Sequence, residues 1–264
     1  MHRILFTLTL LTGISAITTF AAPTVYVVPV DVQAALEQGR GFDREFDVER
    51  AHAAYLTGTL RDSTSYELWW RLAHAAGNRG MRAEFDHDRP RAEAAYAEAV
   101  RAARKAVALD PAGWEGHAEL AANLGRYALF QGGKNKLKLS KEVKAEADRA
   151  IQLNPRSDRA YHVLARWNRA IAQLSFFEKA GAKVIYGGVP KGASMNNAVT
   201  LFEKAIELAP DYAHHRLELG RTYLDLGLKD KAREQLERAL RSPRQSPFDP
   251  EYQAEAKRLL EKTR

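Results

Sequence analysis

The sequence predicts an all-α protein built from stacked helix pairs, on three observations. Residues that favour helix (Ala, Leu, Glu, Lys and Arg) are abundant in a chain of 264 residues that is 45% hydrophobic and 28% charged. A short phrase occurs three times, as KAVALDPAGW, RAIQLNPRSD and KAIELAPDYA. The last unit also repeats its pattern of small and large apolar residues 34 positions later: Ala198, Phe202 and Ala205, then Ala232, Leu236 and Ala239.

The recurring phrase contains a helix end, a turn marked by proline and the start of the next helix. Proline cannot continue a helix but suits the turn that follows one. The spacing of small residues around the phrase is that of the tetratricopeptide repeat (TPR), a pair of helices in 34 residues. We therefore expect a TPR superhelix of about four to five helix pairs with insertions, in which each pair buries its apolar face against its neighbours.

The N-terminus reads MHRILFTLTLLTGISAITTFAAP. A basic start at His2 and Arg3 precedes an uncharged apolar run from Ile4 to Phe20, and small residues follow at Ala21 and Ala22. This layout is typical of a secretory signal, so we expect residues 1–21 to be a signal peptide that is removed. The alternative is an uncleaved anchor helix. The mature protein is then expected to be exported, to the periplasm if the source is a Gram-negative bacterium.

After the signal, we expect an N-terminal extension over 22–44 and the helical repeat domain over 45–264. Within the extension, DVQAALEQG only suggests a helix. SYELWWRLAHAAGN fits the first helix of a unit, and the cleanest unit covers 195–241.

Insertions separate the equivalent small residues of successive units. Ala106, Ala150 and Ala205 are 44 and 55 residues apart, which exceeds 34 by 10 and 21, and Gly58 precedes Ala106 by 48, an excess of 14. All three insertions fall between the first and second helix of a unit. They are therefore expected to project from one edge of the superhelix, where function is expected rather than packing.

The longest insertion contains KVIYGGVPKGASM, residues 183–195. We expect a long or kinked helix that its glycines end, followed by a helix that Ser194 caps. A short hairpin is the alternative, because Val, Ile and Tyr favour strands. The apolar tip of this insertion either folds back onto the core or docks a partner. The candidate docking residues are Phe176, Phe177, Ile185 and Tyr186.

Three stretches occur in a distinctive order over about residues 45–262: SYELWWRLAHAAGN, KAVALDPAGWEGHAELA, and the run from YGGVPKGASM to LERAL. In this order and spacing the sequence resembles the regulator of microtubule dynamics family of TPR proteins. The resemblance implies an all-helical fold without enzymatic activity, and it transfers no catalytic residue. Animal members of the family are linked to microtubules and organelle contacts. Because the signal predicts export, we do not expect a microtubule function here.

The first helices of stacked repeats line a concave groove, and the repeat register places mostly basic residues there. Guanidinium groups suit carboxylates, so the expected ligand is an acidic peptide or a chain terminus, held by exposed arginines. The alternative is a solvated basic face, on a protein of net charge +7. The candidate groove residues are Trp70, His74, Asn78, Arg126, Arg159, His162, Arg166, Arg169, His214 and Arg221.

Two further motifs have weaker interpretations. KNKLKLSKEVK, residues 134–144, carries five lysines but lacks the interleaved aromatics of a nucleic-acid surface. We expect an exposed helix face and no nucleic acid, with contact to an anionic membrane surface left open.

FDHDRPR, residues 85–91, offers Asp86, His87 and Asp88, but adjacent side chains share one ion poorly. An aspartate there is more simply the start of a helix, and we expect no metal site.

The chain contains no cysteine, which excludes disulfides, thiolate zinc sites and cysteine nucleophiles. It also shows no nucleophile elbow, phosphate loop or zinc-peptidase motif. We therefore expect a non-enzymatic scaffold or adaptor of the cell envelope that needs no cofactor and binds other proteins. The alternative is a periplasmic, transport-associated helper that holds a small ligand or a solute-binding protein. It would need an enclosed pocket, with Trp70 as its first candidate residue.

Overall fold

The computed structural model describes residues 30–131, 133–175, 179–180, 183 and 192–264, and every regular element in this part of the chain is a helix. The all-α prediction is confirmed. The helices are α1 (Val30–Arg44), α2 (Val48–Arg61), α3 (Tyr66–Phe85), α4 (Arg89–Leu109), α5 (Trp114–Tyr127), α6 (Gly133–Leu153), α7 (Asp158–Ala172), α9 (Met195–Leu208), α10 (Ala213–Asp225), α11 (Lys229–Arg241) and α12 (Asp249–Leu260), with short 3₁₀ turns at Ala128–Phe130 and Glu261–Thr263.

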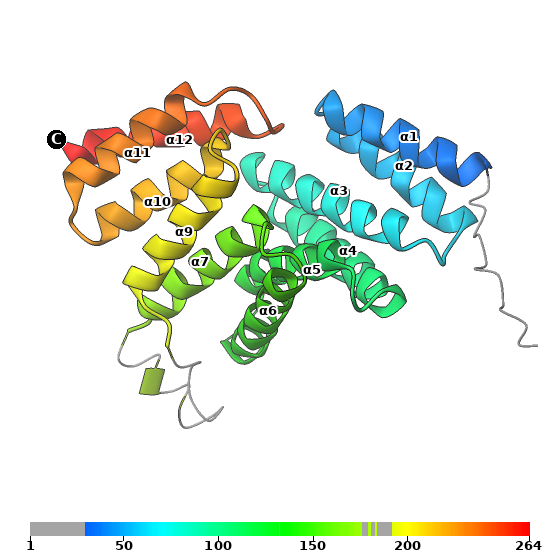
Figure 1. Ribbon diagram of the computed structural model, residues 1–264, viewed down its shortest axis with the longest axis horizontal. Coiled ribbons are helices and arrows are strands. Elements are labelled where there is room, and N and C mark those ends of the chain that lie inside the picture. Colours follow the sequence, from blue (N-terminus) through cyan, green and yellow to red (C-terminus); the bar gives the residue numbers. More distant parts are fainter. Residues whose placement is uncertain (1–29, 132, 176–178, 181–182, 184–191) are drawn as a thin grey trace, which may run out of the picture.

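The helices pack as consecutive pairs that stack into a curved array (Figure 1). The pairs are α1 with α2, α3 with α4, α5 with α6, α7 with α9, and α10 with α11, while α12 packs on α10 and α11. The first helices of neighbouring pairs also touch, α3 on α5 and α5 on α7. These are the contacts of a helical repeat, in which each unit covers the apolar face of the next.

The proline phrases end helices where the sequence places them. Helices α4, α6 and α9 end at Leu109, Leu153 and Leu208, each directly before its proline-marked turn. Ser194 caps α9 as predicted, because its side chain accepts a hydrogen bond from the backbone N–H of Asn197 at 3.0 Å. Asp88 caps α4 in the same way, with the backbone N–H of Arg91 as donor.

Small residues allow the paired helices to approach closely. Gly220 of α10 lies against Leu236 of α11, and a β-carbon on the glycine would be 2.8 Å from the leucine side chain. Because Leu236 is fully buried, that side chain has no free space to move into. The repeat's requirement for a small residue at this crossing is therefore a steric one.

The insertions lengthen helices as well as loops. Helices α3 and α4 have 20 and 21 residues and are joined by a short turn, while α6 has 21 residues and carries the lysine-rich stretch. On α6, Lys138 and Lys141 are exposed, whereas Leu137 and Val143 are buried. The longest insertion lies largely outside the described residues, so the helix and hairpin alternatives for 183–195 both stay predictions.

Helix α12 joins the last pair to an early one. The segment before it, residues 245–248, reaches from α11 toward the N-terminal helices (Figure 1). The ring of Phe248 lies 5.8 Å from that of Phe85 at the end of α3, and the Tyr252 hydroxyl lies 4.0 Å from the sulfur of Met81. The curved array is therefore bridged across its concave side by the start of α12.

Candidate functional site

A cleft of about 1240 Å³ lies on the concave side of the array. The first helices α3, α5, α7 and α10 line it, and the segment Gln245–Tyr252 closes it from the side of α12. Its surface is rich in aromatic side chains, with Trp70, Trp114 and Trp167 among them. The stacking of first helices thus produces the concave site that the repeat register predicts.

The structure brings most of the candidate groove residues together. Eight of the ten line the cleft: Trp70, His74, Asn78, Arg126, Arg159, His162, Arg166 and His214. Arg169 and Arg221 do not line it and instead belong to an ion-pair cluster between helices. The candidate docking residues Phe176, Phe177, Ile185 and Tyr186 lie outside the described residues.

The expectation of exposed arginines is wrong, because Arg126, Arg159, Arg166, Arg169 and Arg221 are all partly buried. Most of them are also paired. Arg126 pairs with Glu84 at 3.0 Å, and Arg159 pairs with Glu119 at 2.8 Å. The side chain of Arg169 is only 12% exposed. The physical reason is that acidic residues of neighbouring helices face these arginines. Five carboxylates and five Lys or Arg side chains line the cleft, so its basic charge is largely compensated.

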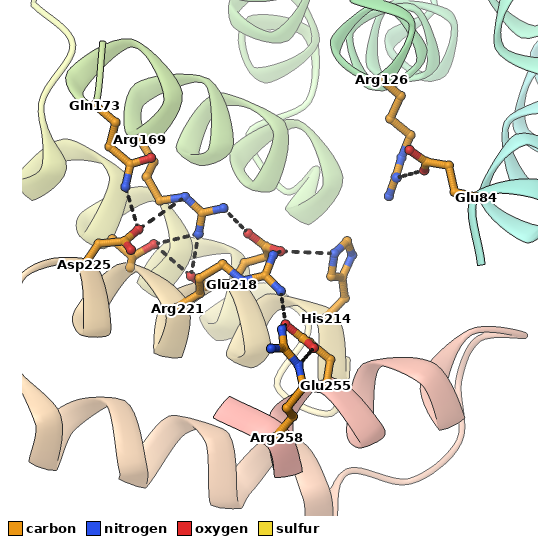
Figure 2. Close-up of polar contacts among 11 residues, drawn as sticks. Glu84, Arg126, Arg169, Gln173, His214, Glu218, Arg221, Asp225, Glu255 and Arg258 are labelled. Carbon is orange, nitrogen blue, oxygen red and sulfur yellow. Dashed lines mark hydrogen bonds and ion pairs between the residues drawn. The ribbon is translucent and has the colours of Figure 1, made fainter. Parts of the chain in front are cut away.

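Glu218 of α10 is the centre of the ion-pair cluster (Figure 2). Its carboxylate lies 2.6 Å from Arg169 Nη2, 2.9 Å from Arg221 Nη1 and 3.8 Å from His214 Nε2. Burial raises the pKa of Glu218, but the facing arginines outweigh it and lower the pKa to about 2. Arg221 continues the network to Glu255 of α12 at 2.8 Å, so these charges also hold α12 in place.

Arg166 of α7 differs from the other arginines that line the cleft. Among the described residues it forms no hydrogen bond and no ion pair, whereas Arg71, Arg126 and Arg159 each face a carboxylate. Its side chain is half-buried at the cleft surface. Burial, together with Arg126 and Arg169 nearby, lowers the pKa of Arg166, and Glu218 opposes that shift. The cleft therefore contains one uncompensated guanidinium.

Three histidines lie between α7 and α10 beside Arg166. The Nδ1 atoms of His162 and His215 are 2.9 Å apart, and His215 Nε2 lies 2.9 Å from a carboxylate oxygen of Asp158. The ring of His214 stacks on that of Tyr252, with centroids 4.1 Å apart. Burial and the surrounding positive groups lower the pKa of both His162 and His214 well below 6.5, so both are neutral in the folded protein.

Acidification is expected to destabilise the protein through these two histidines. Below pH 6.5 the unfolded chain binds protons that buried His162 and His214 do not, so stability present near pH 7.5 is lost as the pH falls. The loss should be about 1 kcal/mol per histidine for each pH unit below 6.5. Urea unfolding of the wild type and of His162→Gln at pH 7.5 and 5.5 measures it.

The His162→Gln variant should show a smaller loss between the two pH values than the wild type. His87→Gln is the matched control, because His87 is exposed in the turn before α4. Equal pH dependence in His162→Gln and the wild type would show that His162 is not held neutral.

Sequence reasoning missed two groups of cleft residues. It missed the carboxylates that neutralise the arginines, above all Glu119, which is 4% exposed and accepts from both His74 and Arg159. The sequence did contain a signal for the Arg159–Glu119 pair. The two residues are 40 positions apart, close to the repeat spacing of 34, which places them on neighbouring first helices. It also missed Phe248 and Tyr252, which lie beyond the last repeat phrase and match no repeat position.

Within the described ranges, no group of three or more metal-ligating side chains is placed to hold an ion. The rings of His162, His214 and His215 pack against one another at tilted angles, with centroids 4.5 Å apart for His162 and His214 and 4.9 Å apart for His162 and His215. No helix in these ranges has the length and apolarity that crossing a membrane requires.

Comparison with known proteins identifies relatives over most of the chain. The profile of the family "Regulator of microtubule dynamics protein 1-3" matches residues 35–264. Regulator of microtubule dynamics protein 1 of Bos taurus is 26% identical over 231 residues, which cover 87% of this chain and 71% of that protein. The protein of the same name from Caenorhabditis elegans is 33% identical over 129 residues, covering 49% of this chain and 57% of the relative.

One solved structure supports the fold directly. The crystal structure of TTC0263, a thermophilic TPR protein of Thermus thermophilus, matches with a TM-score of 0.63 and 16% identity, covering 87% of this chain and 98% of that chain. At this identity the similarity shows the fold alone, and it confirms the predicted TPR superhelix.

The comparisons overturn the predicted localisation. The relatives matched here are animal proteins named for microtubule dynamics, not bacterial periplasmic proteins. The prediction of export to a periplasm is therefore wrong. It depended on the N-terminal apolar run alone, and that run lies outside the described residues.

Proposed function

The chain belongs to the regulator of microtubule dynamics family, and from this membership and the chemistry of the cleft we propose that it is a non-enzymatic scaffold that binds a peptide segment of another protein in its concave cleft. The TPR fold and the family both point to protein interaction rather than catalysis. The segment is apolar or aromatic over most of its length and carries a negative charge where it meets Arg166.

The single observation that carries this proposal is the composition of the cleft. Apolar atoms provide most of its surface, and its arginines are neutralised by local carboxylates except at Arg166. Such a surface favours a ligand with a largely apolar body and a fixed anionic group. A strongly acidic segment would be repelled by the carboxylates that line the cleft. The sequence predicts an acidic peptide or a chain terminus, and we propose in its place a segment with a single essential negative charge.

The test is binding of defined peptides to the full chain. An array of N-acetylated heptapeptides of random sequence is probed with the labelled wild type and with Ala122→Phe. Ala122 lines the cleft on α5, so a phenylalanine there fills space that a peptide would occupy. Ala108→Phe is the matched control, because Ala108 is exposed on α4 and does not line the cleft.

We expect Ala122→Phe to weaken the binding of selected peptides at least about tenfold, and Ala108→Phe to leave it unchanged. Equal binding by all three proteins would exclude the cleft as the site. Because the relatives are named for microtubule dynamics, co-sedimentation of the same three proteins with microtubules is a second, independent readout.

A small anionic ligand is the second candidate function, favoured by the segment of α12 that closes the cleft. Phe248 and Tyr252 bridge α3 and α10, which makes the site more enclosed than an open repeat groove. Native mass spectrometry of the purified protein distinguishes the two: a co-purifying small molecule lost in Ala122→Phe favours the small ligand, whereas peptide binding without one favours the scaffold.

A further inference from the structure

The unpaired Arg166 is the most unusual charged group of the cleft. A half-buried guanidinium that lacks a counter-ion is unfavourable, because partial burial weakens its hydration and no carboxylate of the described residues pairs with it. The neighbouring arginines show how the same protein satisfies such groups elsewhere, with Arg126 facing Glu84 and Arg159 facing Glu119. An anionic group of a bound ligand would give Arg166 the counter-ion that the other arginines of the cleft already have.

Glu218 is the carboxylate that acts on the pKa of Arg166, but it already pairs with other residues. Glu218 is 3% exposed and is shared by Arg169, Arg221 and His214. It therefore raises the pKa of Arg166 without pairing with it, while Arg126 and Arg169 add positive potential at the same place. The cleft is consequently positive at this point although its charges balance over the whole surface.

A second polar group beside Arg166 also lacks a partner. His162 is 6% exposed and lines the cleft, and its Nε2 atom forms no hydrogen bond. Its Nδ1 atom is occupied by His215. Arg166 and His162 are four residues apart on α7 and so lie on the same face of that helix. The buried Nε2 atom of His162, which has no hydrogen-bond partner, and the guanidinium of Arg166, which has no counter-ion, together mark a place where a polar ligand group belongs.

The wall formed by α12 determines which part of a peptide reaches this place. Tyr252 stacks on His214 of α10 and contacts Met81 of α3, so it spans the cleft next to Arg166. Tyr252 is also among the groups that raise the pKa of Arg166. In the proposed pose, an extended peptide runs along the cleft toward this wall and ends there. The group that faces Arg166 is then the end of the chain.

We infer that Arg166 receives the C-terminal carboxylate of the bound segment, an inference that rests on the proposed peptide binding and names its anchoring group. The planar guanidinium offers two parallel N–H donors to the two carboxylate oxygens. A side-chain carboxylate could reach Arg166 only if the peptide turned away from the α12 wall. The partner is accordingly a protein whose free C-terminal segment is largely apolar.

The first test requires no variant. The heptapeptide array is synthesised twice, once with free C-terminal carboxylates and once with carboxamides, and both forms are probed with the wild-type full chain. Selected peptides are then measured by calorimetry. We expect the carboxamide to bind at least about tenfold more weakly than the free acid, as the loss of a charge-assisted pair implies.

Substitution of Arg166 locates the effect. In Arg166→Gln the free acid and the carboxamide should bind equally, both as weakly as the carboxamide binds the wild type. Arg166→Lys should restore part of the preference, since it keeps the charge but not the paired donors. Arg101→Gln is the matched control, because Arg101 is exposed on α4, and it should keep the full preference.

The outcomes separate this inference from the function on which it rests. Equal binding of both peptide forms to the wild type overturns the inference and leaves peptide binding intact. A preference that survives in Arg166→Gln overturns the assignment to Arg166. If no peptide of either form binds, the proposed function fails as well.

Discussion

Replacing Glu218 with alanine is expected to lower the free energy of unfolding by about 3–5 kcal/mol. The carboxylate is 3% exposed and lies 2.6 Å from Arg169 and 2.9 Å from Arg221. Its removal leaves Arg169, which is 12% exposed, with only Asp225 at 4.0 Å as a counter-ion. An unpaired buried charge costs more than the pair contributes, so the loss should exceed that of an ordinary surface ion pair. Urea unfolding monitored by tryptophan fluorescence measures the change.

The matched control for this variant is Glu237→Ala. Glu237 is 46% exposed and lies 3.9 Å from Arg241 on the same helix, so its loss should change stability by less than about 0.5 kcal/mol. A similar small change in Glu218→Ala would show that the cluster of Figure 2 does not stabilise the fold.

Glu218 also predicts how the protein responds to strong acid. Its pKa is about 2 in the folded protein and near 4.5 in the unfolded chain, so its contribution is complete above about pH 5 and is lost as the pH falls toward 2. That difference corresponds to about 3 kcal/mol. The Glu218→Ala variant should therefore lose less stability than the wild type between pH 5 and pH 2.

Replacing Phe248 with alanine is the second change with a large expected effect, again about 3–5 kcal/mol. Phe248 is 2% exposed, packs on the rings of Phe85 and Tyr252, and has the guanidinium of Arg82 5.1 Å from its ring centre. The substitution leaves a cavity between α3 and α12 and loosens the wall that closes the cleft. Urea unfolding measures the loss of stability.

Leu60→Ala controls for the loss of an apolar side chain at a surface site, because Leu60 is 81% exposed. It should change stability by no more than about 0.5 kcal/mol. If Phe248→Ala is equally mild, the start of α12 does not pack on α3 and the cleft is open at that end.

The repeat pattern was enough to predict the fold because its information is local. The turn after Leu109, the small residue at Gly220 and the cap at Ser194 each depend on neighbours in sequence or on the adjacent helix. The pattern also placed eight candidate residues on one cleft, since first helices line the concave side of any such array.

The charge state of the cleft could not be predicted in the same way. Whether Arg126 and Arg159 lack a counter-ion depends on how the side chains of Glu84 and Glu119 are oriented toward them. These glutamates lie 42 and 40 residues away in the sequence. Closure by Tyr252 depends on the curvature accumulated over all the pairs, because only that curvature brings residue 252 next to residue 81. Arg166 stands out only after these partners are known.

The most direct test of the central claim is the affinity of one array-selected peptide for three full-length proteins, measured by calorimetry. The account predicts that Ala122→Phe binds the peptide at least about tenfold more weakly than the wild type. It predicts no change for Ala108→Phe, whose added ring lies outside the cleft. Unchanged affinity in Ala122→Phe, with the protein still folded, would contradict peptide binding in the concave cleft.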